Sequence, residues 1–179
     1  YDLKPVVKTE YNIEGNPSKQ FVEMVLDVKP TQVTLVPDAD DVLTSNAGWD
    51  TVKHQDQLAE LVKEFRRLGV RSSIFVDTNP VHIEYAAKCG VDRIELYTGP
   101  FAEDFSLDPV KAIESYVFAA ELARSLGLEI NAGHDLSLDN LKFFKQSIPW
   151  LAEVSIGHAL ISDALYLGLE NTIQRYKLL

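Results

Sequence analysis

The sequence is poor in cysteine and in basic residues. Cys89 is the only cysteine among 179 residues, so the chain can form no internal disulfide and no metal site built from several cysteines. The net charge is -10, with 17 Lys and Arg against 27 Asp and Glu. The basic residues are scattered, whereas a nucleic-acid surface clusters them to neutralise phosphates. We therefore expect no nucleic-acid partner.

The sequence also lacks any apolar run of the roughly 18 residues that suggest a membrane-spanning helix, and it shows no signal-peptide pattern. No metal-ligand spacing and no glycine-rich dinucleotide fingerprint occur in it. We therefore expect a cytoplasmic protein without a membrane partner or a metal ion.

What the sequence does contain is an alternation of two patterns. With 46% hydrophobic and 25% charged residues it can bury a core, and we expect residues 1–179 to form one globular domain. Apolar, β-rich runs predict buried strands at residues 6–13, 32–36, 72–76, 93–97, 129–132 and 153–156. The segments between them show helical spacing, as in Leu58, Val62 and Phe65.

Proline and glycine mark the ends of the expected helices. Three pairs place a capping side chain before a proline at the first helical position, where the missing N–H costs nothing; they are Asn16-Pro17, Asn79-Pro80 and Asp108-Pro109. Three glycines stand between a helix and the next strand, where a left-handed residue ends the helix; they are Gly69, Gly90 and Gly127. The sequence therefore predicts six successive βα units.

Six such units predict a parallel sheet covered by helices, either a doubly wound open sheet or an eight-stranded TIM (β/α)8 barrel. The barrel is favoured because ionisable residues stand at nearly every strand's carboxyl end, which suits one shared mouth rather than a single crevice. These residues are Glu14, Asp38, Asp77, Glu95, Tyr97, His134 and His158. Six strands are two short of a barrel, and the first strand follows Tyr1 almost at once, so we expect missing sequence upstream.

Two Gly-His pairs, Gly133-His134 and Gly157-His158, stand where a strand is expected to give way to a helix. Glycine lets a ligand approach the backbone, and free N–H groups at a helix N-terminus suit an anion such as phosphate. An imidazole there can transfer protons near pH 7. The alternative is that each histidine is only a satisfied strand-end residue, and two equivalent pairs make that alternative weaker.

Two glutamates are candidates for acid-base chemistry. Glu95 is flanked by apolar residues within its strand, so it is either a catalytic carboxylate with a perturbed pKa or half of a buried ion pair with Arg93 or a lysine. Glu14 ends its strand just before a glycine, which favours a functional role.

The hydroxyl-rich loop at residues 43–50 follows a strand directly. It is either a lid that contacts phosphate or a plain loop in which Asp50 caps the next helix. His54 and His82 fall within helical stretches, and we expect both to be surface or packing residues.

Several segments together resemble the pyridoxine 5′-phosphate synthase family. They are residues 33–37, 44–50, 93–99, 126–134 and 156–161. The resemblance runs in order along essentially the whole chain, and its Asn-Ala-Gly-His and Ile-Gly-His-Ala elements are the most specific parts. Members of that family are (β/α)8 barrels, and the resemblance implies a homo-octamer.

The resemblance also implies a reaction, in which 1-deoxy-D-xylulose 5-phosphate and 3-amino-2-oxopropyl phosphate condense to pyridoxine 5′-phosphate, phosphate and water without a cofactor. It implies that Glu14 is the general base, that Glu95 stabilises intermediates and that His134 donates protons. Thr44 then matches a contact to the deoxyxylulose phosphate. The matches to contacts of the aminoketone phosphate are Asp135, Gly157 and His158.

The chain departs from the family in two respects. Position 135 is Asp where many members have Gly, which bears on a contact made there through the backbone. The family's first two βα units, which carry an Asn-x-Asp-His strand end and a His-x-Arg element, do not occur in these residues, so we expect only part of the site here.

Two alternative functions remain open. One is a catalytically incomplete fragment or binding module of this barrel family. The other is a different phosphate-handling barrel, a lyase or isomerase, whose usual Schiff-base chemistry needs a lysine at a strand end, where Lys8 is the only candidate.

Overall fold

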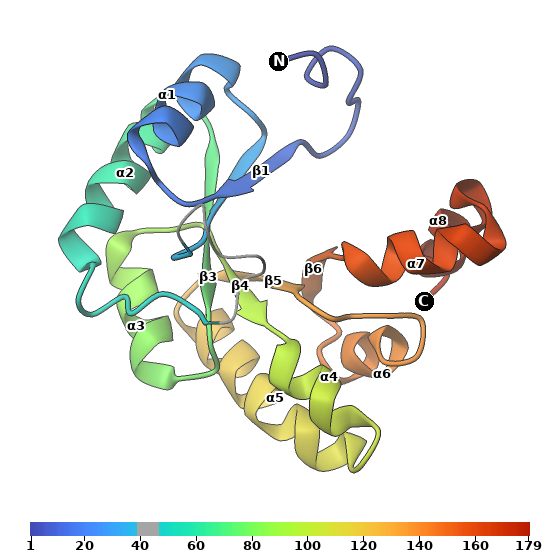
Figure 1. The fold of residues 1–179 in the computed structure, drawn as a ribbon. Coiled ribbons are helices and arrows are strands. Elements are labelled where there is room, and N and C mark those ends of the chain that lie inside the picture. Colours follow the sequence, from blue (N-terminus) through green and yellow to red (C-terminus); the bar gives the residue numbers. More distant parts are fainter. Residues whose placement is uncertain (39–46) are drawn as a thin grey trace.

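The structure, a computed structural model, describes residues 1–38 and 47–179. In these residues each strand is followed by one or two helices (Figure 1). The order is β1 (Asn12–Gly15), α1 (Lys19–Val28), β2 (Gln32–Leu35), α2 (Gln55–Arg67), β3 (Arg71–Val76), α3 (Pro80–Cys89), β4 (Arg93–Tyr97), α4 (Gly99–Phe105), α5 (Pro109–Ser125), β5 (Glu129–Gly133), α6 (Leu141–Ser147), β6 (Leu151–Ser155), α7 (His158–Leu167) and α8 (Leu169–Lys177). Within the same ranges, no helix has both the length and the apolar character needed to cross a membrane.

The strands form one parallel sheet in the order β1-β2-β3-β4-β5-β6, so each strand pairs with its neighbours in the chain. A doubly wound sheet reverses its order at a switch point, and this sheet does not. The helices lie in an arc around the outside of the curled sheet, from α1 through α3 and α5 to α7 (Figure 1). This is the architecture of a (β/α)8 barrel, of which the described residues supply six consecutive strands.

The hydrophobic core lies between the sheet and the helices. Successive strand residues face opposite sides of a sheet. The outward residues Ile74, Ile94 and Ile130 belong to one buried cluster, together with Phe65 of α2 and Phe144 of α6. Fully burying a side chain of this size contributes roughly 1.5–3 kcal/mol, so this layer binds the helices to the sheet.

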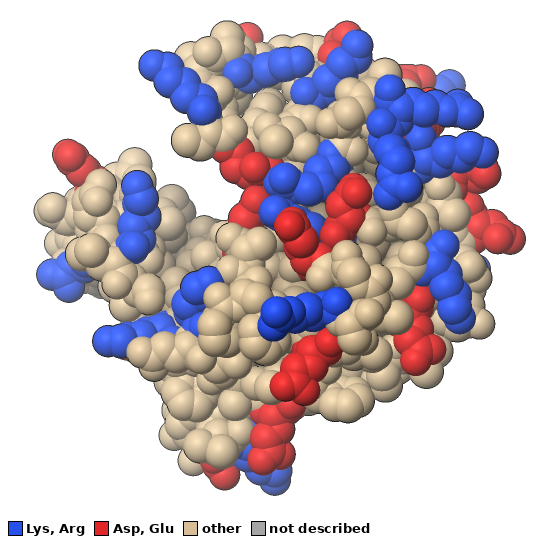
Figure 2. Space-filling view, turned by 180° about the vertical axis from the view of Figure 1, so that it is seen from behind, with Lys and Arg blue, Asp and Glu red and all other residues tan. Residues whose placement is uncertain are grey.

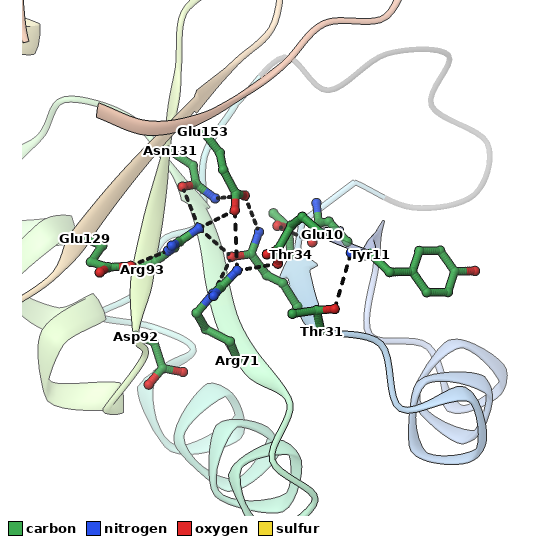
Figure 3. A network of polar contacts seen from close by, with 12 residues as sticks. Glu10, Tyr11, Thr31, Thr34, Arg71, Asp92, Arg93, Glu129, Asn131 and Glu153 are labelled. Carbon is green, nitrogen blue, oxygen red and sulfur yellow. Dashed lines mark hydrogen bonds and ion pairs between the residues drawn. The ribbon is translucent and has the colours of Figure 1, made fainter. Parts of the chain in front are cut away.

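The inner face of the sheet is polar, and an ionic network joins the amino-terminal ends of its strands (Figure 3). Arg93 lies 2.6 Å from Glu153 and 2.6 Å from Glu129. Gln32 donates to Glu153 at 3.1 Å, and Arg71 lies 3.4 Å from the same carboxylate. Acidic and basic side chains also meet in the hollowed middle of the face shown in Figure 2. The network spans β2 to β6 and leaves their carboxyl ends for other chemistry.

The first strand differs from the prediction. A strand was expected at residues 6–13, but β1 begins at Asn12, and the chain before it starts with turns. The amides of Val6 and Val7 donate to the carbonyl oxygen of Leu3. Because Pro5 has no N–H and the next two amides are used within the turn, this segment cannot form a ladder.

Two of the three predicted helix starts are confirmed. Asn79 accepts from the amide of Val81, and Asp108 caps α5 in the same way. The prediction at Asn16-Pro17 is wrong, because α1 begins at Lys19 with Ser18 as its N-cap. The Asn16 side chain instead donates to the carbonyl oxygens of residues 36 and 37, beyond the end of β2. The helix-ending glycines 69, 90 and 127 all have positive φ, as expected.

Candidate functional site

Glu95 of β4 is a buried carboxyl with a free oxygen. Its side chain is 1% exposed, and Oε2 has no hydrogen-bond partner among the described residues. Burial raises the pKa of this carboxyl to about 8, and the neighbouring Glu14 carboxylate adds to the rise. The nearby hydroxyls of Ser155 and Thr34 oppose this rise in the pKa. A carboxyl with this pKa is largely protonated at pH 7.

The surroundings of Glu95 exclude the ion pair with Arg93 that the sequence left open. Arg93, the ion-pair partner considered from the sequence, instead lies against Glu129 and Glu153. On the neighbouring strand β5, a Cβ at Gly133 would overlap the Oε1 atom of Glu95. The missing side chain at Gly133 therefore provides the space that the carboxyl occupies.

Glu14 lies at the end of β1, opposite Thr34 of β2, and is exposed at the mouth. The protein atoms that surround its carboxyl displace water and raise its pKa, while the nearby His134 lowers it. Glu14 thus interacts electrostatically with Glu95 and with His134. The structure brings these three sequence-predicted residues together from three different strand ends.

His134 follows β5 in an unusual backbone conformation. Its φ is 86°, and that of Asp135 is 56°. The imidazole Nδ1 lies 2.9 Å from the Asp135 carboxylate, and the Tyr97 ring packs edge-on with the ring centroids 5.0 Å apart. The expectation that His134 begins a helix is wrong, because α6 begins only at Leu141. Two successive left-handed residues cannot begin a right-handed helix.

The second Gly-His pair does begin a helix. Gly157 is the N-cap of α7, His158 is its first residue, and both are exposed. A Cβ at Gly157 would meet nothing within 4 Å, so packing does not demand glycine there. Free N–H groups at this helix N-terminus suit an anion, as the sequence suggested.

The other candidate residues stand as follows. Thr44 lies outside the described residues. Asp135 adopts a left-handed φ that a glycine also accepts readily, so the Asp at this position is compatible with the same backbone path. His82 lies in α3 with its ring 2.9 Å from Asp77, and His54 precedes α2 and packs edge-on against Trp49. Lys8 is exposed and precedes β1, so it is not at a strand's carboxyl end.

Sequence reasoning missed the hydroxyl groups around the cluster. Thr34 and Ser155 reach Glu95 from β2 and β6, and Thr98 contacts the backbone at His134. Strand alternation could have identified the first two as inward-facing, but the contact of Thr98 depends on how β4 and β5 pair. Among residues 1–38 and 47–179, no group of three or more His, Cys, Asp or Glu is placed to hold a metal ion.

Comparison with known proteins gives a consistent result along the chain. Residues 1–179 match the model of the family described as pyridoxal phosphate biosynthesis protein PdxJ. The pyridoxine 5′-phosphate synthase of Flavobacterium johnsoniae is 62% identical over 98% of this chain and 74% of its own length. The enzyme of the same name from Porphyromonas gingivalis is 57% identical over 99% of this chain and 74% of its own.

Solved structures share the fold at much lower identity. A mutant tryptophan synthase α-subunit from Pyrococcus furiosus has a TM-score of 0.62 at 12% identity, covering 98% of this chain and 67% of that one. A xylose isomerase domain protein from Planctomyces limnophilus has a TM-score of 0.55 at 11% identity, covering 94% and 72%. These likenesses concern the fold alone.

Proposed function

The chain belongs to the family of the pyridoxal phosphate biosynthesis protein PdxJ and acts as a pyridoxine 5′-phosphate synthase; we propose that it does so by general acid–base catalysis at the barrel mouth. Its substrates are phosphorylated small molecules. We propose that they are 1-deoxy-D-xylulose 5-phosphate and 3-amino-2-oxopropyl phosphate. Imine formation, dehydration, phosphate elimination and ring closure each move protons, and a positioned acid or base contributes roughly 10²- to 10⁴-fold to such a step.

The observation that carries the mechanism is the cluster of Glu14, Glu95 and His134. Titratable groups whose surroundings push their pKa values apart can act as acid and base at one pH. Here burial holds the Glu95 carboxyl protonated near neutral pH, whereas Glu14 is exposed and the nearby His134 opposes the rise in its pKa that the surrounding protein atoms cause. A group that carries a proton and a group that can accept one therefore stand together at the mouth of the barrel.

Each member of the cluster has a separate proposed role. Glu14, which substrate can reach from solvent, removes protons. Glu95 stabilises cationic intermediates, because a positive charge beside its free oxygen lowers its pKa, so that its proton passes to the nearby Glu14 carboxylate and a carboxylate remains opposite that charge. His134 donates protons to leaving oxygen atoms. The Asp135 carboxylate lies 2.9 Å from Nδ1, so Nε2 is the ring nitrogen that remains for the substrate.

Substrate binding is proposed for the residues around the cluster. The backbone N–H groups at Gly157 and His158 suit the phosphate of the aminoketone at the start of α7. Asp135 contributes its backbone to the same substrate, and Thr44 contributes a contact to the deoxyxylulose phosphate.

We further propose that residues 1–179 are one domain, corresponding to strands 3 to 8 of the barrel, in a cytoplasmic homo-octamer. A buried core cluster that runs from Val25 to Leu151 supports the single domain. Light scattering of the purified protein tests the octamer, which predicts a mass eight times that of the chain.

The reaction is tested by mixing both phosphates with protein expressed from the complete coding sequence. We expect pyridoxine 5′-phosphate, followed by absorbance, together with released phosphate, and neither product when one substrate is omitted. Folded protein that binds both phosphates yet forms no product would instead support the catalytically incomplete alternative.

A further inference from the structure

Thr98 is a fully buried threonine directly after β4, and it contacts the backbone at His134. Its side chain is 0% exposed. Its Oγ1 lies 2.7 Å from the carbonyl oxygen of Gly133 and also within hydrogen-bonding distance of the carbonyl oxygen of His134. The backbone N–H of Thr98 already donates to Gly133 at 2.9 Å. A carbonyl oxygen can accept two hydrogen bonds, so the single hydroxyl proton of Thr98 can be donated to either of these carbonyl oxygens at the His134 turn.

Thr98 contacts the turn at His134 and Asp135, whose backbone conformation is unfavourable unless other contacts stabilise it. Left-handed φ values are uncommon for residues other than glycine and persist only where the surroundings enforce them. His134 and Asp135 both have such values. On the far side of the turn, Asn140 donates to the carbonyl oxygen of Asp135 at 3.1 Å and accepts from the amide of Ser137 at 2.9 Å. Thr98 supplies the matching contact on the near side.

The neighbours of Thr98 tie the same segment to the cluster. Tyr97, the preceding residue, packs its ring edge-on against the imidazole of His134. Glu95 lies two residues earlier, in the space that Gly133 leaves free. The end of β4 thus shapes the His134 turn through a ring contact and a hydroxyl contact.

We propose that Thr98 is a positioning residue for His134. Its hydroxyl holds the left-handed turn that aims the imidazole at the mouth, and it does not itself touch the substrate. This inference rests on the proposed role of His134 as the proton donor.

The test compares Thr98→Val, which keeps the shape and removes the hydroxyl, with Thr98→Ser, which keeps the hydroxyl. Thr51→Val is the matched control, because Thr51 is also 0% exposed and its hydroxyl donates to the backbone carbonyl of His82 at 2.7 Å. Misplacement of a catalytic group by about 1 Å can cost 10²-fold, so we expect Thr98→Val to lower kcat by roughly 10- to 100-fold. The KM of each substrate should stay near its wild-type value, Thr98→Ser should recover most of kcat, and Thr51→Val should leave kcat unchanged.

A second readout does not depend on turnover. ¹⁵N-histidine labelling gives imidazole signals, and single substitutions identify those that belong to the four histidines of these 179 residues. Thr98→Val should move the His134 signals and leave those of His158 in place, whereas Thr51→Val should leave His134 unmoved. If Thr98→Val does not fold, Thr98→Ala removes the same hydroxyl without a branched side chain.

Wild-type kcat together with unmoved His134 signals in Thr98→Val would overturn the inference. Equal loss of kcat in Thr98→Ser would also overturn it, since the hydroxyl would then not be what matters. Absence of product from the wild type would contradict the proposed function, but the His134 signals would still test the positioning.

Discussion

Replacing Glu95 with Gln should stabilise the protein against unfolding at alkaline pH. In the folded protein the buried carboxyl keeps its proton up to pH about 8, whereas in the unfolded chain it ionises near its ordinary pKa of 4.5. Between these values folding takes up a proton, so the stability of the wild type falls as pH rises through this window. Glutamine has nearly the same shape and stays neutral, so the variant does not share this loss.

The size of the effect follows from the two pKa values. One pKa unit corresponds to about 1.4 kcal/mol. The interval between 4.5 and about 8 therefore makes Glu95→Gln more stable than the wild type by about 5 kcal/mol at pH 9, relative to their difference at pH 4. Below pH 4.5 the carboxyl is protonated in both states, and this contribution disappears.

Urea unfolding of wild type and variant at pH 4, 6 and 9 measures this difference directly. The matched control is Glu114→Gln, which replaces an exposed glutamate on α5 and should give a difference that does not change with pH. If the difference between wild type and Glu95→Gln is the same at pH 4 and pH 9, the folded protein does not hold a proton on Glu95, and the proposed role of that residue is wrong.

Three further substitutions probe other parts of the structure. Glu14→Gln should lower kcat by roughly 10²- to 10⁴-fold, and an unchanged steady-state rate would contradict the role of Glu14 as the base. The substitution also removes a carboxylate that repels Glu95, so urea unfolding should show less loss of stability at alkaline pH than in the wild type. Gly133→Ala should cost about 1–3 kcal/mol in thermal unfolding and lower kcat, because its Cβ would overlap Oε1 of Glu95; wild-type stability would show that this space is not needed. Arg93→Met should cost about 3 kcal/mol in thermal unfolding, because it leaves Glu153 without its closest cation. Because the Glu153 charge also raises the pKa of Glu95, the variant should lose more stability than the wild type as pH rises; wild-type stability at every pH would refute the role given to this ion pair.

The parts of the fold that depend on neighbouring residues could be predicted from the sequence. The caps at Asn79 and Asp108 are formed with amides two or three residues away, so the local sequence specifies them. Asn16 has the same appearance in the sequence, but its amide is used by carbonyl oxygens some twenty residues later. No local pattern shows that competition.

The same difference between local and long-range contacts applies to the candidate site. The sequence suggested Glu14, Glu95 and His134 because each stands at or near a strand end. It left open whether Glu95 pairs with Arg93, because the actual partners of Arg93 come from β5 and β6. The space at Gly133 and the contact of Thr98 both depend on the pairing of β4 with β5, in which Tyr97 lies opposite Gly133. Strand pairing therefore supplied what residue types alone could not.

The central claim is that this barrel mouth makes pyridoxine 5′-phosphate with His134 as the proton donor. The most direct test is the rate of product formation from the two phosphates by the wild type and by His134→Asn, with circular dichroism to show that both are folded. We predict turnover by the wild type and none detectable in the variant. A folded variant that forms product at the wild-type rate, or a wild type that forms none, would contradict the claim.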